Sequence, residues 1–313
     1  MNNYKPEGTL ISELKNLEYT SSYEGLEKAL KLGVILEGRA LLCDAFMNLH
    51  IEFRSGVRGI IPKEECQYSD GDEEIKDIAI LTRVGKTVCF KVIGFKEDGK
   101  NKKCAILSRR QAQMECREYY VNTLERGDII PARVTHLEHF GAFVDIGCGI
   151  ISLLSIDTIS VSRISHPGER FSVGDFIFAV VKDIDERGRI SVSERELLGS
   201  WEENALLFSE GETVEGIIRS VENYGVFVEL TPNLAGLAEY RDDVYPGQSC
   251  AVYIKSIIPE KMKIKLIIID VGNNEIKKSA LKYFIDVERV YHIDSWKYSP
   301  SSAKKRIETI FVD

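Results

Sequence analysis

Two short stretches of the sequence place an aromatic side chain where a β-strand would face solvent. In the first, Ala142, Val144 and Ile146 alternate with Phe143 and Asp145. A half-buried strand has a side-chain period of two, so the first set is predicted to be buried and the second set to lie on the polar face. Phe143 is then a flat ring held at the surface, and such rings stack on flat ligands, of which nucleic-acid bases are the commonest.

The same arrangement recurs about eighty residues downstream. Val226, Val228 and Leu230 form the inward set of this second stretch, and Phe227 and Glu229 are predicted to face outward. A repeat with an aromatic at the same place predicts two similar domains that hold their ligand by stacking, which is a non-covalent mechanism.

The sequence has no motif that would support catalysis or bind a metal. It contains no glycine-rich phosphate-binding loop, no His-Glu-x-x-His and no Gly-x-Ser-x-Gly. The five histidines do not have the spacing of metal ligands, and the seven cysteines are odd in number and include no Cys-x-x-Cys pair. We therefore expect a protein that is not an enzyme and has no cofactor or metal.

The composition is that of a globular protein with an acidic surface. The hydrophobic share is 44%, and the formal net charge is −8. The chain has no apolar run of the roughly 20 residues needed to span a bilayer, and its start does not read as a signal peptide, so a cytoplasmic protein with no membrane partner is expected. The acidic charge disfavours a binder that depends on phosphate contacts, and RNA held by stacking should show a shallow salt dependence.

Alternating apolar runs, five to a group, predict a mainly β fold of three tandem five-stranded barrels joined by short helices. An N-terminal helical segment precedes the barrels, and a small α/β tail follows them, with a strand-like run from Phe284 to Ile293 and a final helix after Ser302. The predicted divisions are a helical lead-in (1–34), a degenerate first barrel (35–110), a helical linker (111–125), a second barrel (126–197), a helical linker (198–209), a third barrel (210–271) and a C-terminal appendage (272–313).

Residues 127–197 resemble the RNA-binding domain of bacterial small-subunit ribosomal protein S-one, which is an oligonucleotide-binding barrel. The resemblance rests on four pieces of sequence, which are Gly127-Asp128, Phe140-Gly141-Ala142-Phe143-Val144, Val173-Gly174-Asp175 and Arg189-Ile190-Ser191-Val192-Ser193. Residues 210–270 match less completely, through Tyr224-Gly225-Val226-Phe227-Val228, and residues 35–110 match weakly. The resemblance implies three barrels of this family and an RNA-binding protein of the translation machinery.

The resemblance also implies which residues contact RNA. In the second barrel the family's aromatic and basic positions fall on Phe140, Phe143 and Arg189, and the neighbouring His139 and Arg187 are added to them. In the third barrel they fall on Tyr224, Phe227, Lys263 and Lys265. A histidine that is common at the end of the family's third strand is replaced by Ser155 and Glu239, so this chain lacks one contact in each barrel. The second barrel is the better candidate.

The first barrel departs most from the pattern. Met47 and His50 stand where the second barrel has Phe140 and Phe143, so the stacking pair is missing. By analogy with the ribosomal family, this barrel is expected to dock on the small ribosomal subunit or its proteins.

The function predicted from these features is the binding of single-stranded messenger RNA in translation. Two alternatives stay open, a protein-docking scaffold that has largely lost its affinity for RNA and an accessory factor of RNA decay or transcription.

Overall fold

The computed structural model describes residues 4–53, 56–69, 75–97, 103–272 and 281–312. The chain forms two compact units. The first contains Met1–Leu124 with Pro131–Arg133 and Asp145–Ile151, and the second contains Glu125–Ile130, Val134–Val144 and Ser152–Asp313. The start of the predicted appendage, residues 273–280, lies outside the described residues. No helix in the described part of the chain is both long enough and apolar enough to cross a membrane.

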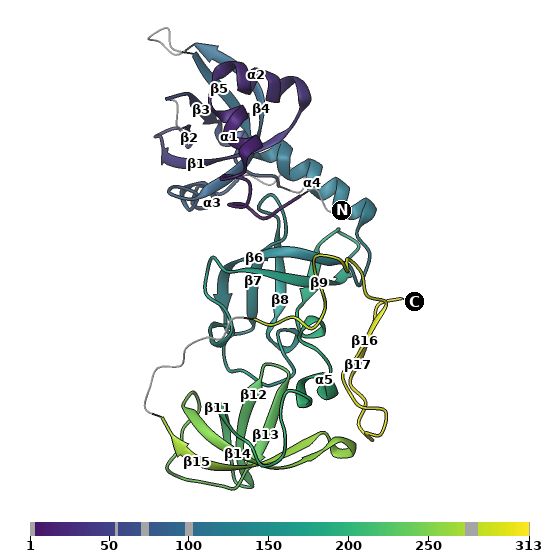
Figure 1. Ribbon diagram of the computed structural model, residues 1–313. Helices are drawn as coiled ribbons and strands as arrows, with labels where there is room; N and C mark the ends of the chain where they lie inside the picture. The colour runs from purple at the N-terminus through teal and green to yellow at the C-terminus, as the bar shows by residue number, and fades with distance from the viewer. Residues whose placement is uncertain (1–3, 54–55, 70–74, 98–102, 273–280, 313) are drawn as a thin grey trace. The chain divides into compact units, whose positions relative to one another are not determined.

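The predicted fold class is confirmed, because the chain forms three closed five-stranded barrels (Figure 1). The first has the strand order β1-β2-β3-β5-β4. Its strands are β1 (Ile35–Cys43), β2 (Leu49–Glu52), β3 (Arg58–Ile61), β4 (Thr87–Glu97) and β5 (Lys103–Ser108). Inward side chains from all five strands, with Leu36, Ile51 and Phe90 among them, form one hydrophobic core.

Two helices precede the first barrel, α1 (Leu14–Thr20) and α2 (Tyr23–Leu32). Ser22 caps the start of α2 by accepting a hydrogen bond from the backbone N–H of Gly25, and Gly33 ends the helix in the left-handed conformation. Leu26 and Ala29 on α2 are fully buried in the core of the barrel. The helical lead-in is therefore an integral part of this barrel's core.

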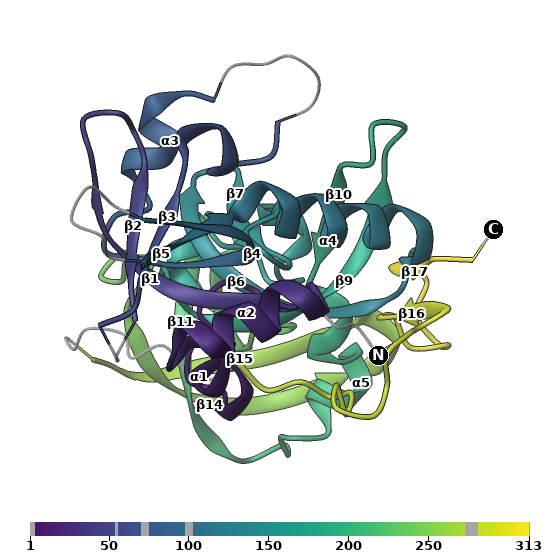
Figure 2. The same cartoon turned by 90° about the horizontal axis from the view of Figure 1, so that it is seen from above.

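The second barrel follows α4 (Arg109–Thr123), which packs against β4 of the first barrel (Figure 2). The strand order of the second barrel is β10-β8-β7-β6-β9. Its strands are β6 (Ile129–Glu138), β7 (Gly141–Asp145), β8 (Ile151–Ser155), β9 (Phe176–Ile184) and β10 (Ile190–Ser193).

The third barrel follows the short helix α5 (Trp201–Ala205) and has the order β11-β12-β13-β15-β14. Its strands are β11 (Thr213–Glu222), β12 (Gly225–Thr231), β13 (Leu234–Ala238), β14 (Ser249–Ile258) and β15 (Lys263–Val271). Trp201 is 2% exposed and packs into the core of this barrel, as does Trp296 from the C-terminal tail.

Short elements make up the remaining connections. They are α3 (Asp77–Leu81), η1 (Lys63–Glu65), η2 (Ile156–Thr158), η3 (Pro167–Glu169), η4 (Arg195–Leu198) and η5 (Pro259–Lys261).

The C-terminal tail differs from the prediction. It contains the strand pair β16 (Ser295–Lys297) and β17 (Glu308–Ile310), and no helix lies within residues 281–312. The predicted strand from Phe284 to Ile293 is wrong, although its alternating apolar side chains do pack on the core that includes Ile129 and Val180. The backbone of this segment makes isolated hydrogen bonds to the second barrel, such as Phe284 N–H to Leu197 O at 2.9 Å, and they do not form a ladder.

Candidate nucleic-acid interface

Each of the second and third barrels carries a pair of aromatic rings at the start of its second strand. Phe140 and Phe143 meet edge to face, with ring centroids 6.0 Å apart and ring planes at 87°. Tyr224 and Phe227 have the same 6.0 Å and 87°. The first ring of each pair is open to solvent, at 55% exposure for Phe140 and 68% for Tyr224, and the second is half-buried. The two barrels thus present the same aromatic surface.

A glycine inside each pair allows this arrangement. A Cβ atom on Gly141 would lie 2.5 Å from the carbonyl oxygen of Leu154 on β8, and a Cβ on Gly225 would collide with the carbonyl oxygen of Ala238 on β13. The second and third strands approach so closely here that only glycine fits. The glycine in the aromatic-Gly-x-aromatic spacing therefore meets a packing requirement of the barrel.

In the second and third barrels, the third strand lies between the strand that carries the aromatic pair and the strand beside the basic candidates. In the third barrel Phe227 is paired with Leu237 on β13, and Leu237 is paired with Lys265 on β15. The equivalent parallel pair in the second barrel joins Leu153 to Ser191 on β10. This register makes Ser191 the counterpart of Lys265, and it places Arg189 and Lys263 at matching positions, each two residues before the paired residue.

The basic candidates are exposed, but their surroundings differ. Lys263 and Lys265 both project from β15 into solvent. Arg189 lies in the turn before β10, where its Nε atom is 2.7 Å from Oδ2 of Asp185, and its side chain is 71% exposed. The backbone N–H of Arg187 also donates to the carboxylate of Asp185, at 2.9 Å. Asp185 therefore orders this turn and offsets part of its positive charge.

Two histidines extend the aromatic surface of the second barrel. His139 is exposed, and its ring meets His166 edge to face at 5.1 Å. His136, on β6, lies nearly parallel to Phe143, with centroids 6.3 Å apart and an angle of 23°. His136 is not among the residues predicted to bind RNA, because its contact with Phe143 depends on how β6 and β7 pair.

The predicted exposure of the two acidic residues is wrong. Asp145 is 2% exposed, and its carboxylate accepts hydrogen bonds from the backbone N–H groups of Glu7 (2.7 Å), Gly147 (2.8 Å) and Gly149 (2.9 Å). Glu229 is 5% exposed and binds two arginines. Local alternation correctly separates the two faces of a strand, but it does not show that a segment distant in sequence covers one of them.

The first barrel has no aromatic pair at this place. His50 is paired with Ile60 on β3, in the register that Phe227 has with Leu237 in the third barrel. The Nε2 atom of His50 lies 3.0 Å from Oδ2 of Asp44, so the imidazole already has a partner within its own barrel. The structure thus agrees with the alignment that places His50 opposite the stacking ring.

Among the described residues, no group of three or more His, Cys, Asp or Glu side chains could hold a metal ion. The most perturbed carboxyl group of the second compact unit is Glu194, which is fully buried at the end of β10. Burial raises the pKa of Glu194 to about 8, and the hydroxyl of Tyr283 donates to its Oε1 atom at 3.2 Å. The hydrogen bond from Tyr283 ties Glu194 to the C-terminal tail, so we assign this carboxyl group a structural role.

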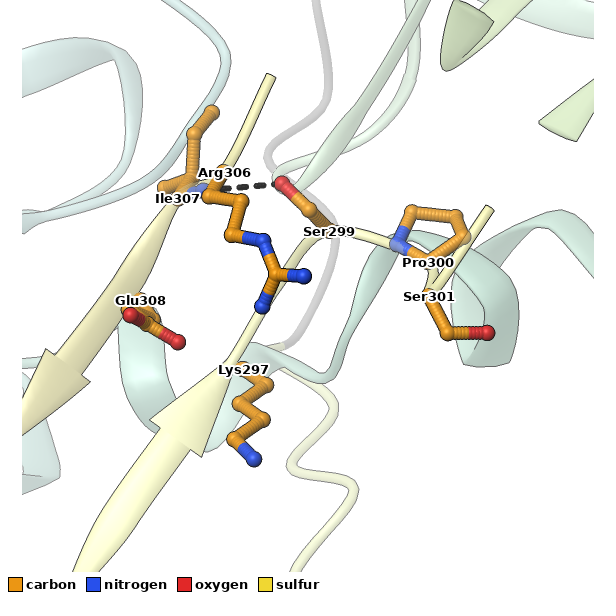
Figure 3. Close-up of a pocket in the computed structure, with 7 residues that line it drawn as sticks. All are labelled: Lys297, Ser299, Pro300, Ser301, Arg306, Ile307 and Glu308. Carbon is orange, nitrogen blue, oxygen red and sulfur yellow. Dashed lines mark hydrogen bonds between the residues drawn. The ribbon is translucent and has the colours of Figure 1, made fainter. Parts of the chain in front are cut away.

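The C-terminal tail contains a hollow (Figure 3). Its lining consists of Lys297, Ser299, Pro300, Ser301, Arg306, Ile307 and Glu308. The hydroxyl of Ser299 accepts a hydrogen bond from the backbone N–H of Ile307 at 2.8 Å, which ties the two arms of the hairpin together. None of the residues predicted to bind RNA contributes to this hollow.

Tandem closed barrels, each with the same strand order around the sheet and two with an aromatic pair at the second strand, define a protein of the oligonucleotide-binding fold. Residues 123–195, which cover the second barrel, match the family model of the S1 RNA binding domain. The small ribosomal subunit protein bS1 of Staphylococcus aureus strain COL is 28% identical over 276 residues, which cover 83% of this chain and 67% of that protein. The predicted resemblance is confirmed, because residues 123–195 match the S1 RNA binding domain and the chain is similar to bS1 over most of its length.

Two solved structures are also similar to parts of this chain. A multidomain protein with nucleic acid binding domains from Streptococcus pneumoniae is 18% identical, with a TM-score of 0.25 and coverage of 75% of this chain and 73% of that one. GSP13 from Bacillus subtilis is 32% identical over 23% of this chain and 57% of its own, with a TM-score of 0.22. The family model is named for an RNA binding domain, and the curated relative is named as a protein of the small ribosomal subunit.

Proposed function

We propose that the second and third barrels bind single-stranded RNA by stacking unpaired bases on their aromatic pairs. The observation that carries this proposal is the repetition of one edge-to-face geometry, 6.0 Å and 87°, at the same place in two barrels. A ring that served only the core would not need to be more than half exposed, as Phe140 and Tyr224 are. The match of residues 123–195 to an RNA-binding family supports the same conclusion.

The arrangement favours one course for the RNA strand. Bases stack on Phe140 and Phe143, the backbone crosses β8, and its phosphates meet Arg187 and Arg189 beyond it. In the third barrel Tyr224 and Phe227 take the place of the phenylalanines, and Lys263 and Lys265 take the place of the arginines. Stacking on aromatic side chains contributes about 1–3 kcal/mol per base, and every base has a flat face, so the binding tolerates many sequences.

The stacking mechanism accounts for RNA binding by a chain whose formal net charge is −8. Phosphate contacts give affinity that falls steeply with salt, whereas stacking does not depend on counterion release. Four basic side chains beside two aromatic pairs are sufficient for local attraction without a basic surface overall. The acidic net charge and the aromatic pairs distinguish this chain from RNA-binding proteins whose affinity comes mainly from phosphate contacts.

We place this RNA binding in translation, in the cytoplasm, with messenger RNA as the strand that is bound. The curated relatives are proteins of the small ribosomal subunit. A sequence-tolerant single-strand binder of this kind would hold unpaired messenger RNA near the subunit. An accessory role in RNA decay or transcription would use the same stacking site, and association with ribosomal subunits separates it from the role in translation.

The experiment that tests RNA binding compares one sequence in two forms. A fluorescently labelled, unstructured pyrimidine-rich RNA is titrated with the full chain, first alone and then annealed to its complement, and anisotropy is recorded. The account predicts clear binding of the single strand and binding at least tenfold weaker to the duplex, because paired bases are not free to stack. Equal affinity for both forms would contradict it.

The first barrel supports a second role, which is docking on proteins of the small ribosomal subunit. His50 is held by Asp44 instead of being open for stacking, and Leu41, Leu42 and Phe46 expose 46%, 48% and 80% of their surface. Exposed apolar residues of this kind mark protein interaction sites. Co-sedimentation with small subunits should fall several-fold for Phe46→Ser while RNA affinity stays unchanged, and equal sedimentation of the variant would reject the docking role.

A further inference from the structure

We propose that the second and third barrels bind one RNA strand as a single preassembled site, in which Arg170 and Glu229 are the positioning pair. This inference rests on the proposed function and adds to it a fixed relation between the two aromatic pairs. The evidence is a chain of contacts inside the second compact unit that runs from Phe227 to Phe140.

The first contact in this series is the one between Glu229 and Arg170. Glu229 lies two residues after Phe227 on β12, so both side chains project from the same face of the strand. Arg170, in the segment between β8 and β9 of the second barrel, donates from its Nη1 atom to Oε1 of Glu229 at 2.9 Å and from Nη2 to Oε2. The side chains of Arg170 and Glu229 are each only 5% exposed.

The second part anchors the same carboxylate inside the third barrel. Arg219, on β11, donates to Glu229 from Nε at 2.9 Å and from Nη2 at 3.0 Å. The Nη1 atom of Arg219 also binds Glu169, which lies beside Arg170 in the second barrel. An arginine of the second barrel therefore binds a glutamate of the third, and an arginine of the third binds a glutamate of the second. The four formal charges cancel.

The third part leads from Glu169 to the stacking site of the second barrel. The carboxylate of Glu169 accepts from the backbone N–H of Ser165 at 2.8 Å and from that of His166 at 3.2 Å, which fixes the start of η3. The ring of His166 meets His139 at 5.1 Å, and His139 adjoins Phe140 in the sequence. These contacts, with short stretches of backbone from Phe227 to Glu229 and from His139 to Phe140, thus join the two aromatic pairs.

The chemistry of the pair suits it to positioning. A guanidinium group that binds both oxygens of a carboxylate fixes an angle as well as a distance, because its donors form a rigid planar fork. A buried ion pair adds little net stability, but breaking it leaves an uncompensated charge, so the two barrels are held in one orientation. The network is electrically neutral and buried, and it therefore attracts no phosphate itself.

If the two aromatic pairs are held in a fixed relation, the affinity for RNA should depend on the length of the RNA. An RNA of about five nucleotides fills only one barrel, whereas one of about thirty is longer than the roughly 4–16 nucleotides that a single barrel occupies and can extend to both. When two sites are held in register, the second binding event is intramolecular, and affinity rises by about 100-fold or more without new kinds of contact. If the barrels moved independently, part of that gain would be lost in ordering them.

The experiment measures the ratio of the affinities for the long and the short oligouridine in the wild-type chain and in Arg170→Met. Methionine keeps much of the packed stem, and Glu229 keeps its pairing with Arg219. We expect the affinity for the short RNA to stay within about twofold and the long-to-short ratio to fall by about tenfold or more. The matched control is Arg241→Met, which removes an arginine that pairs with Asp243 at the surface of the third barrel and should leave the ratio unchanged.

The outcomes separate this inference from the proposed function. An unchanged ratio in Arg170→Met, with both affinities intact, would overturn the positioning role and leave RNA binding in place. Failure of the wild-type chain to bind either RNA would overturn both. If Arg170→Met lowers the thermal unfolding midpoint and the short-RNA affinity, Arg170→Lys replaces it, because lysine keeps the charge without the bidentate geometry. The ratio must then fall while the short-RNA affinity is retained, or the inference is wrong.

Discussion

Phe140 and Phe143 meet edge to face at the start of β7, with their ring planes at 87°. This contact orients both rings before any ligand arrives, and aromatic pairs of this kind contribute about 0.5–1.5 kcal/mol beyond the burial of their surface. Because Tyr224 and Phe227 repeat the geometry, the two barrels present preorganised surfaces for stacking.

The ring pair should behave as one unit in RNA binding. Phe140→Ala removes a stacking surface and also releases Phe143 from its fixed orientation, so we expect it to weaken binding by about 1–3 kcal/mol. The double variant Phe140→Ala with Phe143→Ala should lose less than the sum of the two single losses. Anisotropy titrations of the four proteins check this prediction, and strict additivity would show that the rings act independently.

The glycine between the third barrel's rings should be essential for stability. In Gly225→Ala the new methyl group would collide with the carbonyl oxygen of Ala238, so we expect a loss of about 1–3 kcal/mol in the free energy of unfolding. Trp201 and Trp296 both lie in the core of this barrel, and their fluorescence in urea reports its unfolding. The control is Gly94→Ala on β4 of the first barrel, where a Cβ atom meets nothing within 4 Å. Its unfolding is followed by circular dichroism, because both tryptophans lie in the third barrel, and its stability should change little. Equal effects of the two substitutions would contradict the packing argument.

The buried carboxyl of Glu194 should make stability depend on pH. Burial raises its pKa from 4.5 to about 8, so between these values the folded chain holds a proton that the unfolded chain has released. The free energy of unfolding should therefore fall as pH rises through this window, with a contribution of up to about 1.4 kcal/mol per pH unit. Glu194→Gln removes this contribution, and the variant should gain stability relative to the wild type from pH 5 to pH 8. Parallel profiles in urea unfolding would contradict the assignment.

The salt dependence of RNA binding should be shallow. Each phosphate contact on a single strand contributes a slope of about −0.7 to the plot of log affinity against log salt concentration, so the four basic candidates allow at most about −3. The pairing of Arg189 with Asp185 should reduce the slope further. A series of titrations at different potassium chloride concentrations measures it. A slope steeper than about −4 would show that charge contributes more than the structure accounts for.

The sequence was sufficient to predict the barrels and the aromatic faces, because both follow from local alternation. Phe143 and Phe227 lie on the polar side of strands whose other side forms the core, as the period of two requires. The glycines that accompany them mark a close approach of neighbouring strands, and that approach is local to one hairpin.

The features that could not be predicted depend on contacts between distant residues. Arg170 is 59 residues before Glu229 in the chain, and no local pattern indicates that they meet. The stacking of His136 on Phe143 requires the pairing of β6 with β7. In the tail, alternating apolar residues from 283 to 293 resemble a strand, but they pack on an existing core and pair with the second barrel only through an isolated bridge between His292 and Asp128.

We propose that the aromatic pair on the second strand binds unpaired bases, and Phe143→Ala, which removes the half-buried ring of that pair, tests this. The full chain and this variant are titrated with the same pyrimidine-rich single-stranded RNA, together with Phe176→Ala, an exposed aromatic on β9, which does not neighbour β7 in the barrel. The account predicts that Phe143→Ala weakens binding by about 1–3 kcal/mol and that Phe176→Ala leaves it unchanged. Unchanged affinity in a folded Phe143→Ala variant would contradict the account.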